Sequence, residues 1–183
     1  KKLKEALDDM SCFQEENVVA PKDACLKEQN GEYVIVPEEE GNTLDRTKVE
    51  KAVKDAIESG KTEINLEELG GYEKPSVWKD DPALIAERDA KNQLLKVNVT
   101  YDFGDRSETV DGSVVKDWLI QDSDGNWTVD ESKAADYVQQ LAYKYDTFGL
   151  THEFTTHAGK KITLKGGDYG WVIKKKETTA ALV

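Results

Sequence analysis

Three short segments of this sequence carry the residue types of a serine acyl-transfer site. Ser113-Val-Val-Lys116, Ser123-Asp-Gly125 and Lys165-Gly-Gly167 follow one another in the order of the SxxK, SxN and KTG motifs of penicillin-recognising enzymes. The first two segments lie too close together for the helical subdomain that such enzymes place between them, and Gly125 stands where the second motif requires Asn. The spacing therefore argues against serine catalysis.

One acidic segment matches part of a calcium-binding loop. Positions 3, 5, 6 and 12 of such a loop are matched by Asp122, Asp124, Gly125 and Glu131. Position 1, however, is Ile120, which has no side-chain oxygen. Because the first ligand is missing, a turn made by Asp and Gly is the better interpretation. We predict no metal site and no cofactor for the chain.

The histidines and cysteines do not complete a catalytic or zinc site. His152 and His157 flank a predicted hairpin without a nucleophile or a ligand set beside them, so exposed turn histidines are the favoured interpretation. Cys12 and Cys25 have neither CxxC spacing nor a neighbouring His. In an exported protein they could form a disulfide, whose loop would contribute about 3 kcal/mol. The alternative is a pair of buried reduced thiols.

Aromatic side chains remain as the candidate binding groups. Trp78 lies in a Pro-containing loop, and Trp127 lies where the second of two repeats has one residue more than the first. Both are predicted to present a ring on which a sugar can stack. Trp118 and Trp171 occur in strand-like or helix-like patterns and are predicted to lie in the core.

The charge of the chain limits its partners. With 25 Lys and Arg against 37 Asp and Glu, the net charge is -12, which speaks against nucleic acid and against an anionic membrane surface. The apolar content of 38% is enough for a folded core. We find no run of about 18 apolar residues and no signal peptide. The chain starts and stops within helical patterns, so we expect it to be part of a longer protein.

The elements that would position these residues include two helices, predicted at 46–59 and 131–145, whose residues correspond at the same spacing. The positions Gly41/Asn42, Asp45, Lys48 and Val53 correspond to Gly125/Asn126, Asp130, Lys133 and Val138. Each Asp stands where a helix N-cap is expected. Each helix also carries an apolar stripe, composed of Val49, Ala52, Val53, Ala56 and Ile57 in the first and Ala134, Tyr137, Val138, Leu141 and Ala142 in the second. These matches indicate an internal duplication.

The remaining pattern mixes strands with a third helix. Strands are predicted at 32–36, 61–66 and 97–103, a helix from Asp81-Pro82 to about Leu95, and hairpins at SETV and at HEFTT with KKITL. The order predicts an α+β fold with two related β-helix-β units, antiparallel hairpins and helices packed on sheets. We divide the chain into a first repeat unit with an N-terminal helix (1–70), a linker helix and hairpin (71–112), and a second repeat unit (113–183).

Several segments resemble one known family, in order along the chain. The tail FTTHAGKKITLKGGDYGWVIKKKE is similar to the segment before the catalytic domain of Gram-positive L,D-transpeptidases of the YkuD type. YVIVPEEEGNTLDRTKVEKAVKDAIESGKTEINL resembles the repeated unit of their peptidoglycan-binding domain, which is also found in VanW-type surface proteins. GGYEKPSVWKDDPAL and VTYDFGDRSETVDGSVVKDWL are similar to the linker parts, so the resemblance spans about Leu7 to Glu177.

The resemblance implies a non-catalytic module that binds peptidoglycan and positions a C-terminal transpeptidase domain of the same chain. It implies an extracytoplasmic place at the cell surface or wall, with the membrane reached only through an anchor outside this sequence. Those enzymes attack the stem peptide through the Cys of an SHGC-type motif, whereas this chain has no Cys after Cys25, so no catalytic residue carries over. The competing hypothesis is a purely structural spacer between anchor and catalytic domain.

Overall fold

The chain divides into two compact units. The computed structural model describes residues 2–183. Unit 1 is Lys1–Asp89 and unit 2 is Ala90–Val183, and the division falls within the helix α3 (Pro82–Leu94). Each unit has a hydrophobic core of its own. The three-part division at 1–70, 71–112 and 113–183 stays a prediction.

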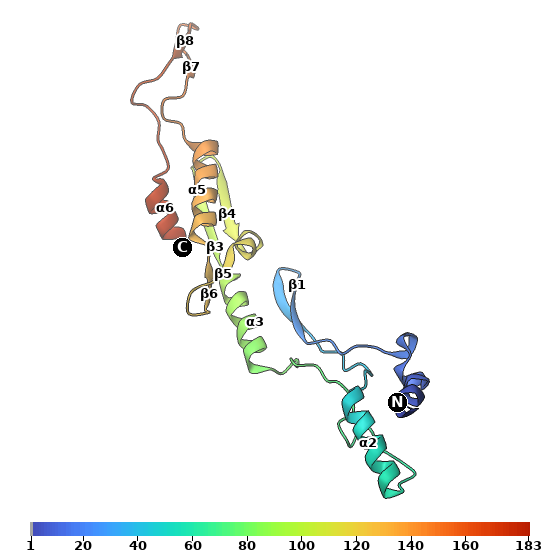
Figure 1. The fold of residues 1–183 in the computed structure, drawn as a ribbon. Coiled ribbons are helices and arrows are strands. Elements are labelled where there is room, and N and C mark those ends of the chain that lie inside the picture. Colours follow the sequence, from blue (N-terminus) through green and yellow to red (C-terminus); the bar gives the residue numbers. More distant parts are fainter. Residues whose placement is uncertain (1) are drawn as a thin grey trace. The chain divides into compact units, whose positions relative to one another are not determined.

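Unit 1 combines helices with one antiparallel hairpin (Figure 1). Before α3 its elements are α1 (Lys2–Asp8), the 3-10 turns η1 (Ser11–Phe13) and η2 (Glu15–Asn17), β1 (Cys25–Gln29), β2 (Glu32–Val36) and α2 (Arg46–Ser59). Leu26 of β1 lies opposite Ile35 of β2. The turn at Asn30-Gly31 closes the hairpin with positive φ at both residues, which suits Asn and Gly.

Unit 2 contains three antiparallel hairpins and the second long helix (Figure 1). Its elements are β3 (Asn98–Asp102), β4 (Ser107–Asp111), α4 (Gly112–Val115), η3 (Lys116–Trp118), β5 (Leu119–Gln121), β6 (Trp127–Val129), α5 (Glu131–Tyr145), β7 (His152–Thr155), β8 (Lys161–Leu164) and α6 (Lys175–Leu182). Helices and antiparallel hairpins together confirm the predicted α+β class.

One predicted strand is wrong. Residues 61–66 form no strand. Instead, the Asn65 side chain accepts hydrogen bonds from the backbone N–H groups of Glu67 and Glu68, and Leu66 O accepts from Gly71 N at 2.8 Å. These hydrogen bonds stabilise a turn in place of an extended strand. The extended segment that flanks α2 comes later, at Tyr72, which bridges antiparallel to Leu44.

The start of α2 is fixed to that extended segment. Asp45 caps the helix by accepting from the backbone N–H of Lys48. The backbone N–H of Asp45 in turn donates to Gly71 O at 2.7 Å. Lys48 Nζ donates to Gly70 O at 3.3 Å, one residue earlier. Cap, backbone and lysine therefore all hold the helix start against residues 70–72.

The start of α5 repeats these contacts with other residues. Asp130 accepts from the backbone N–H groups of Ser132 and Lys133. The backbone N–H of Asp130 donates to Trp118 O at 2.7 Å, and Lys133 Nζ donates to Asp117 O, again one residue earlier. The correspondence of Asp45 with Asp130 and of Lys48 with Lys133 is therefore physical: one helix-start motif occurs once in each unit.

In unit 1 the helix α2 does not pack on a sheet as predicted. Val49 contacts Leu7 of α1 and Leu44, and the partly buried residues around this cluster are Leu3, Phe13, Val53, Leu66 and Tyr72. The last residue of the predicted stripe, Ile57, is 67% exposed. Residues 61–66 form no strand beside it, so Ile57 has no cover, whereas Ala56, one residue earlier in the stripe, is buried.

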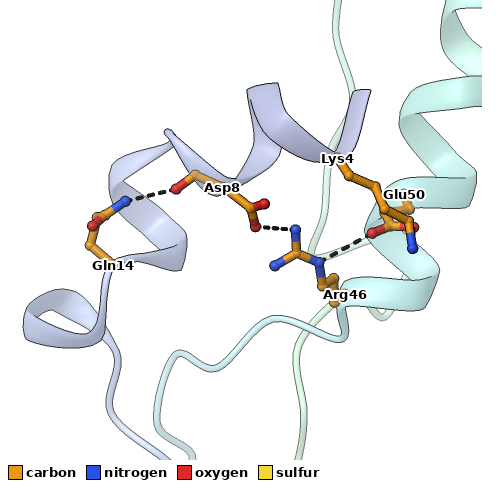
Figure 2. Close-up of polar contacts among 5 residues, drawn as sticks. All are labelled: Lys4, Asp8, Gln14, Arg46 and Glu50. Carbon is orange, nitrogen blue, oxygen red and sulfur yellow. Dashed lines mark hydrogen bonds and ion pairs between the residues drawn. The ribbon is translucent and has the colours of Figure 1, made fainter. Parts of the chain in front are cut away.

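Polar contacts join α1 to α2 (Figure 2). The Arg46 guanidinium donates to the Asp8 carboxylate through Nη2 and to Glu50 Oε1 through Nε at 3.1 Å. Lys4 Nζ lies 3.8 Å from Glu50 Oε2, and Gln14 Nε2 donates to Asp8 O at 2.7 Å. Hydrogen bonds to Asp8 and Glu50 raise the pKa of Arg46, which contacts one carboxylate on each of the two helices.

In unit 2 the helix α5 packs as predicted. Ala134 belongs to a buried cluster with Val110, Val115 and Trp118, and the half-buried side chains around it include Val99 and Tyr101 of β3 and Tyr137 of α5. Val138, Leu141 and Ala142 are also buried, so every turn of the stripe is covered. The helix α6 lies beside α5 (Figure 1), where Lys175 Nζ donates to Gln139 Oε1 at 2.9 Å. Within residues 2–183, none of the helices has the length and apolar character that crossing a bilayer requires.

We predict that Leu141→Ala lowers the free energy of unfolding by about 2–5 kcal/mol, the usual cost of truncating a buried leucine. Leu141 is 4% exposed, whereas Tyr143 on the same helix is 83% exposed. Tyr143→Ala is the matched control and should change the free energy by no more than about 0.5 kcal/mol. Urea unfolding followed by circular dichroism measures both, and equal effects of the two variants would contradict the burial of α5.

Candidate functional site

Trp78 lies in a loop that is held against the β1–β2 hairpin of unit 1. The Asp23 carboxylate accepts from the backbone N–H groups of Ser76, at 2.5 Å, and Val77, at 3.1 Å, and Ala24 N donates to Val77 O at 2.9 Å. Trp78 itself is half-buried. The loop therefore has a defined conformation with part of the indole exposed, and the role of Trp78 as a sugar contact stays a prediction.

Trp127 lies on β6, opposite Gln121 of β5, and is also half-buried. Lys91 Nζ of α3 is 3.9 Å from its ring centroid, so a cation already covers one face of the indole. Trp78 and Trp127 belong to different units, and neither unit combines them in one site. Trp127 also stays a predicted contact, with at most one free face.

The other sequence candidates have structural roles or no partner. Ser113 Oγ donates to Asp111 Oδ1 at 2.6 Å, which is a helix-cap contact of α4. Asp122 accepts from the backbone of Asp124 and Asn126, as a turn residue does. No three His, Cys, Asp or Glu side chains in the described part of the chain are grouped so that they could hold a metal ion.

Cys12 and Cys25 are free thiols, and both are exposed. The alternative of two buried thiols is therefore wrong, because Cys25 starts the open hairpin β1–β2 and Cys12 lies in the short turn η1. A disulfide between them in the oxidised chain stays a prediction.

Trp171 is not a core residue, contrary to the sequence prediction. Its side chain is 45% exposed and that of Tyr169 is 77% exposed. The segment around them forms no strand, because Gly166, Gly167 and Gly170 all adopt positive φ. These two aromatic residues line a hollow of about 460 Å³. We call it the Trp171 pocket, and its lining residues are Thr147, His152, Asp168, Tyr169, Gly170 and Trp171.

A stack of rings supports Trp171 from the side of the core. Its indole stacks on Phe103, with centroids 5.7 Å apart and planes at 17°, and Phe103 stacks on Tyr145 at 4.2 Å and 20°. The Tyr145 hydroxyl donates to Glu108, which also accepts from Lys144. These two hydrogen bonds, that of Lys144 first, lower the pKa of the Glu108 carboxyl, so it is an anion that anchors the stack.

The backbone of the Trp171 pocket is clamped to the end of α5. Thr147 N donates to Trp171 O at 3.0 Å, and Trp171 N donates to Thr147 Oγ1 at 3.1 Å. Ile173 N donates to Asp146 Oδ1 at 2.8 Å. At Gly170 φ is 114°, and a Cβ there would meet Phe148 N at 2.6 Å, so only glycine fits. The aromatic pair is thus presented by a fixed backbone.

His152 also differs from its prediction as an exposed turn histidine. It is half-buried at the start of β7, and its ring meets that of Tyr169 edge to face at 5.6 Å. Its Nε2 is closed off from solvent, and no protein group hydrogen-bonds to it. His157, in the turn of the hairpin, is exposed as predicted.

Unit 1 has a larger hollow beside α2. Its volume is about 1130 Å³, and its walls come from the second half of α2, the segment 61–69 and Tyr72. The charged residues that line it are Asp55, Lys61, Glu63, Glu67 and Glu68. Its four acids against one base suit cationic groups, and we call this hollow the acidic groove.

The chain belongs to the family described as "Putative peptidoglycan binding domain". The family model matches residues 1–65 and 82–183, which is most of the sequence. One matched stretch contains α2 and the other contains α5, the two helices with the shared start motif. The resemblance to this domain that the sequence suggested is thereby confirmed. A search of curated proteins found no significant match.

Two solved structures are similar to part of the chain. The Ldtfm–avibactam carbamoyl enzyme is 25% identical over 54% of this chain and 39% of its own length, with a TM-score of 0.44. An Enterococcus faecium L,D-transpeptidase mutant is 26% identical over 51% of this chain and 38% of its own, with a TM-score of 0.43. The chain spans about two fifths of the length of these proteins.

We predict that the stabilising role of Glu108 depends on pH. A carboxyl with a lowered pKa stabilises the fold above its unfolded value of about 4.3, and this contribution is lost as the pH falls through the lower folded value. Glu108→Gln should therefore lower the melting temperature more at pH 7 than at pH 3. Glu153→Gln, on the exposed strand β7, is the control. A loss that is the same at both pH values would contradict the assignment.

Proposed function

We propose that this chain is a non-catalytic peptidoglycan-binding module that positions an L,D-transpeptidase-type domain of the same protein. The observation that carries the proposal is the family match over residues 1–65 and 82–183. The side chains support it, because the Ser, His and Asp candidates of the sequence serve as caps and turn residues or lack a complete set of partners. Catalysis is left to the attached domain.

Positioning would act through effective concentration. A module that stays bound to the wall keeps a tethered domain near its acceptor strands and so raises the local substrate concentration without a new catalytic contact. The partners are then peptidoglycan and the transpeptidase domain in the same chain, and the place is the extracytoplasmic surface or wall, reached through a membrane anchor elsewhere in the protein. A module that only sets the distance from the membrane is the alternative.

The charge of the chain shapes how it meets the wall. At a net charge of -12 it is repelled by anionic wall polymers at long range. Two features of its surface can contact groups of the wall that are not anionic. Exposed aromatic rings suit uncharged sugar faces, and the acidic groove suits the free amines of uncross-linked stem peptides. The salt dependence of binding distinguishes these two kinds of contact. Because salt screens both the repulsion and the ion pairs, binding through the aromatic rings should rise with salt, whereas binding through the acidic groove should fall.

We predict that the 183-residue chain sediments with purified sacculi, and that more of it sediments at 150 mM salt than at 10 mM. At the higher salt the screening length is about 8 Å, so long-range repulsion is removed while stacking contacts remain. If the bound fraction falls steadily as salt increases, the main contact is the acidic groove. A chain that stays in the supernatant at both salt concentrations would contradict binding and favour the structural spacer.

We predict that Trp78→Ala and Trp127→Ala each weaken this sedimentation by about two- to tenfold, the loss expected for one aromatic contact. Circular dichroism checks that both variants are folded. Tyr33→Ala, a half-buried aromatic on β2, is the matched control in unit 1. If either Trp variant sediments like the unmodified chain, that tryptophan is not a wall contact.

A further inference from the structure

We propose that the Trp171 pocket holds a pyranose ring of the wall's glycan strand. This inference rests on the proposed function and names the part of the polymer that is recognised: the sugar rather than the stem peptide. The pocket lies wholly within unit 2, and its volume of about 460 Å³ is within the range of about 300–1,000 Å³ that small-ligand sites occupy.

The aromatic rings of the pocket are supported from behind and exposed in front. Trp171 is backed by Phe103 and Tyr145, yet nearly half of its side chain remains exposed. Tyr169, two residues earlier, is exposed to 77%. One side of a pyranose is lined by C–H groups, and it buries apolar surface when it lies on such a ring. Because the backbone at Gly170 and Trp171 is clamped to Thr147 and Phe148, little ordering remains to be done on binding.

Polar groups lie around the rings. Thr147 Oγ1 accepts from Trp171 N, which leaves the hydroxyl hydrogen to donate to a ligand. The Asp168 side chain is exposed and supplies a carboxylate acceptor for sugar hydroxyls. His152 Nε2 is buried without a protein partner, an arrangement that costs free energy in the ligand-free chain. Because this atom is closed off from solvent, His152 contributes to the pocket as a ring beside Tyr169 and not as a hydrogen-bonding group for the ligand.

The charges of the pocket favour a sugar over a stem peptide. The pocket contains one carboxylate and no Lys or Arg, so it offers no cation to the carboxylates of a stem peptide. Uncharged hydroxyl and acetamido groups, by contrast, match its aromatic and hydrogen-bonding lining. An N-acetylated hexose in a β-1,4-linked strand has that chemistry.

The test uses the full 183-residue chain and a peptide-free probe, the β-1,4-linked tetramer of N-acetylglucosamine. Binding is measured by titration calorimetry and by tryptophan fluorescence, and sedimentation with sacculi is measured in parallel. The variants are Trp171→Ala and Tyr169→Ala. Because Trp171 supports a ring stack and its loss could unfold unit 2, the exposed Tyr169 provides the second, independent variant. Tyr143→Ala on α5 and Phe154→Ala on β7, both exposed aromatics outside the pocket, are the controls.

We expect the unmodified chain to bind the tetramer, both pocket variants to bind it about tenfold more weakly, and both controls to bind it unchanged. The part of the fluorescence change that comes from Trp171 should be lost in Trp171→Phe, which keeps the other three tryptophans, so this variant should show a smaller change than the unmodified chain. If the chain sediments with sacculi but does not bind the tetramer, or if the pocket variants bind it as well as the controls do, the pocket assignment is overturned and the proposed function stands. If the chain does not sediment at all, the proposed function fails first.

Discussion

A helix start that is fixed on two sides is the constraint on which each unit depends. Asp45 and Asp130 each cap a helix with the side chain, while the backbone N–H donates to the carbonyl of Gly71 or Trp118, the residue just before an extended segment. A lysine in the first turn of each helix donates to the carbonyl one residue earlier: Lys48 to Gly70 O, and Lys133 to Asp117 O. The cap thus decides where the helix begins and what it lies against, and the apolar stripe can then be buried on only one side.

In unit 2 this constraint reaches as far as the Trp171 pocket. With α5 fixed at Asp130 and packed on the β3–β4 hairpin, its last residue, Tyr145, lies under Phe103. The residues that follow α5 are then in place to hold the backbone of Trp171. In unit 1 the same start is followed by a helix whose last stripe residue, Ile57, is exposed, and an acidic groove lies where a sheet was predicted. The same helix-start motif therefore occurs in two different packing environments.

Local signals in the sequence predicted the elements well and the surroundings less well. The helices at 46–59 and 131–145 and the strand at 32–36 have the predicted bounds, because caps and periodicity are encoded by neighbouring residues. Residues 61–66 alternate like a strand, but the Asn65 turn competes successfully. The strand β1 was missed, since its exposed CLKEQ has no apolar alternation. Trp171 was placed in the core because its pattern was taken for a strand, although three glycines around it argued for an irregular segment.

The chain belongs to a family of peptidoglycan-binding domains, and the Trp171 pocket is the site that we propose for the glycan. Trp78 and Trp127 remain further candidate contacts. The most direct measurement is a nuclear magnetic resonance titration of the isotope-labelled chain with peptide-free glycan strands, which follows the indole N–H signals of all four tryptophans. The account predicts that the signal of Trp171 moves while that of the buried Trp118 does not. A titration in which Trp171 stays unmoved while another tryptophan shifts, or in which none shifts, would contradict it.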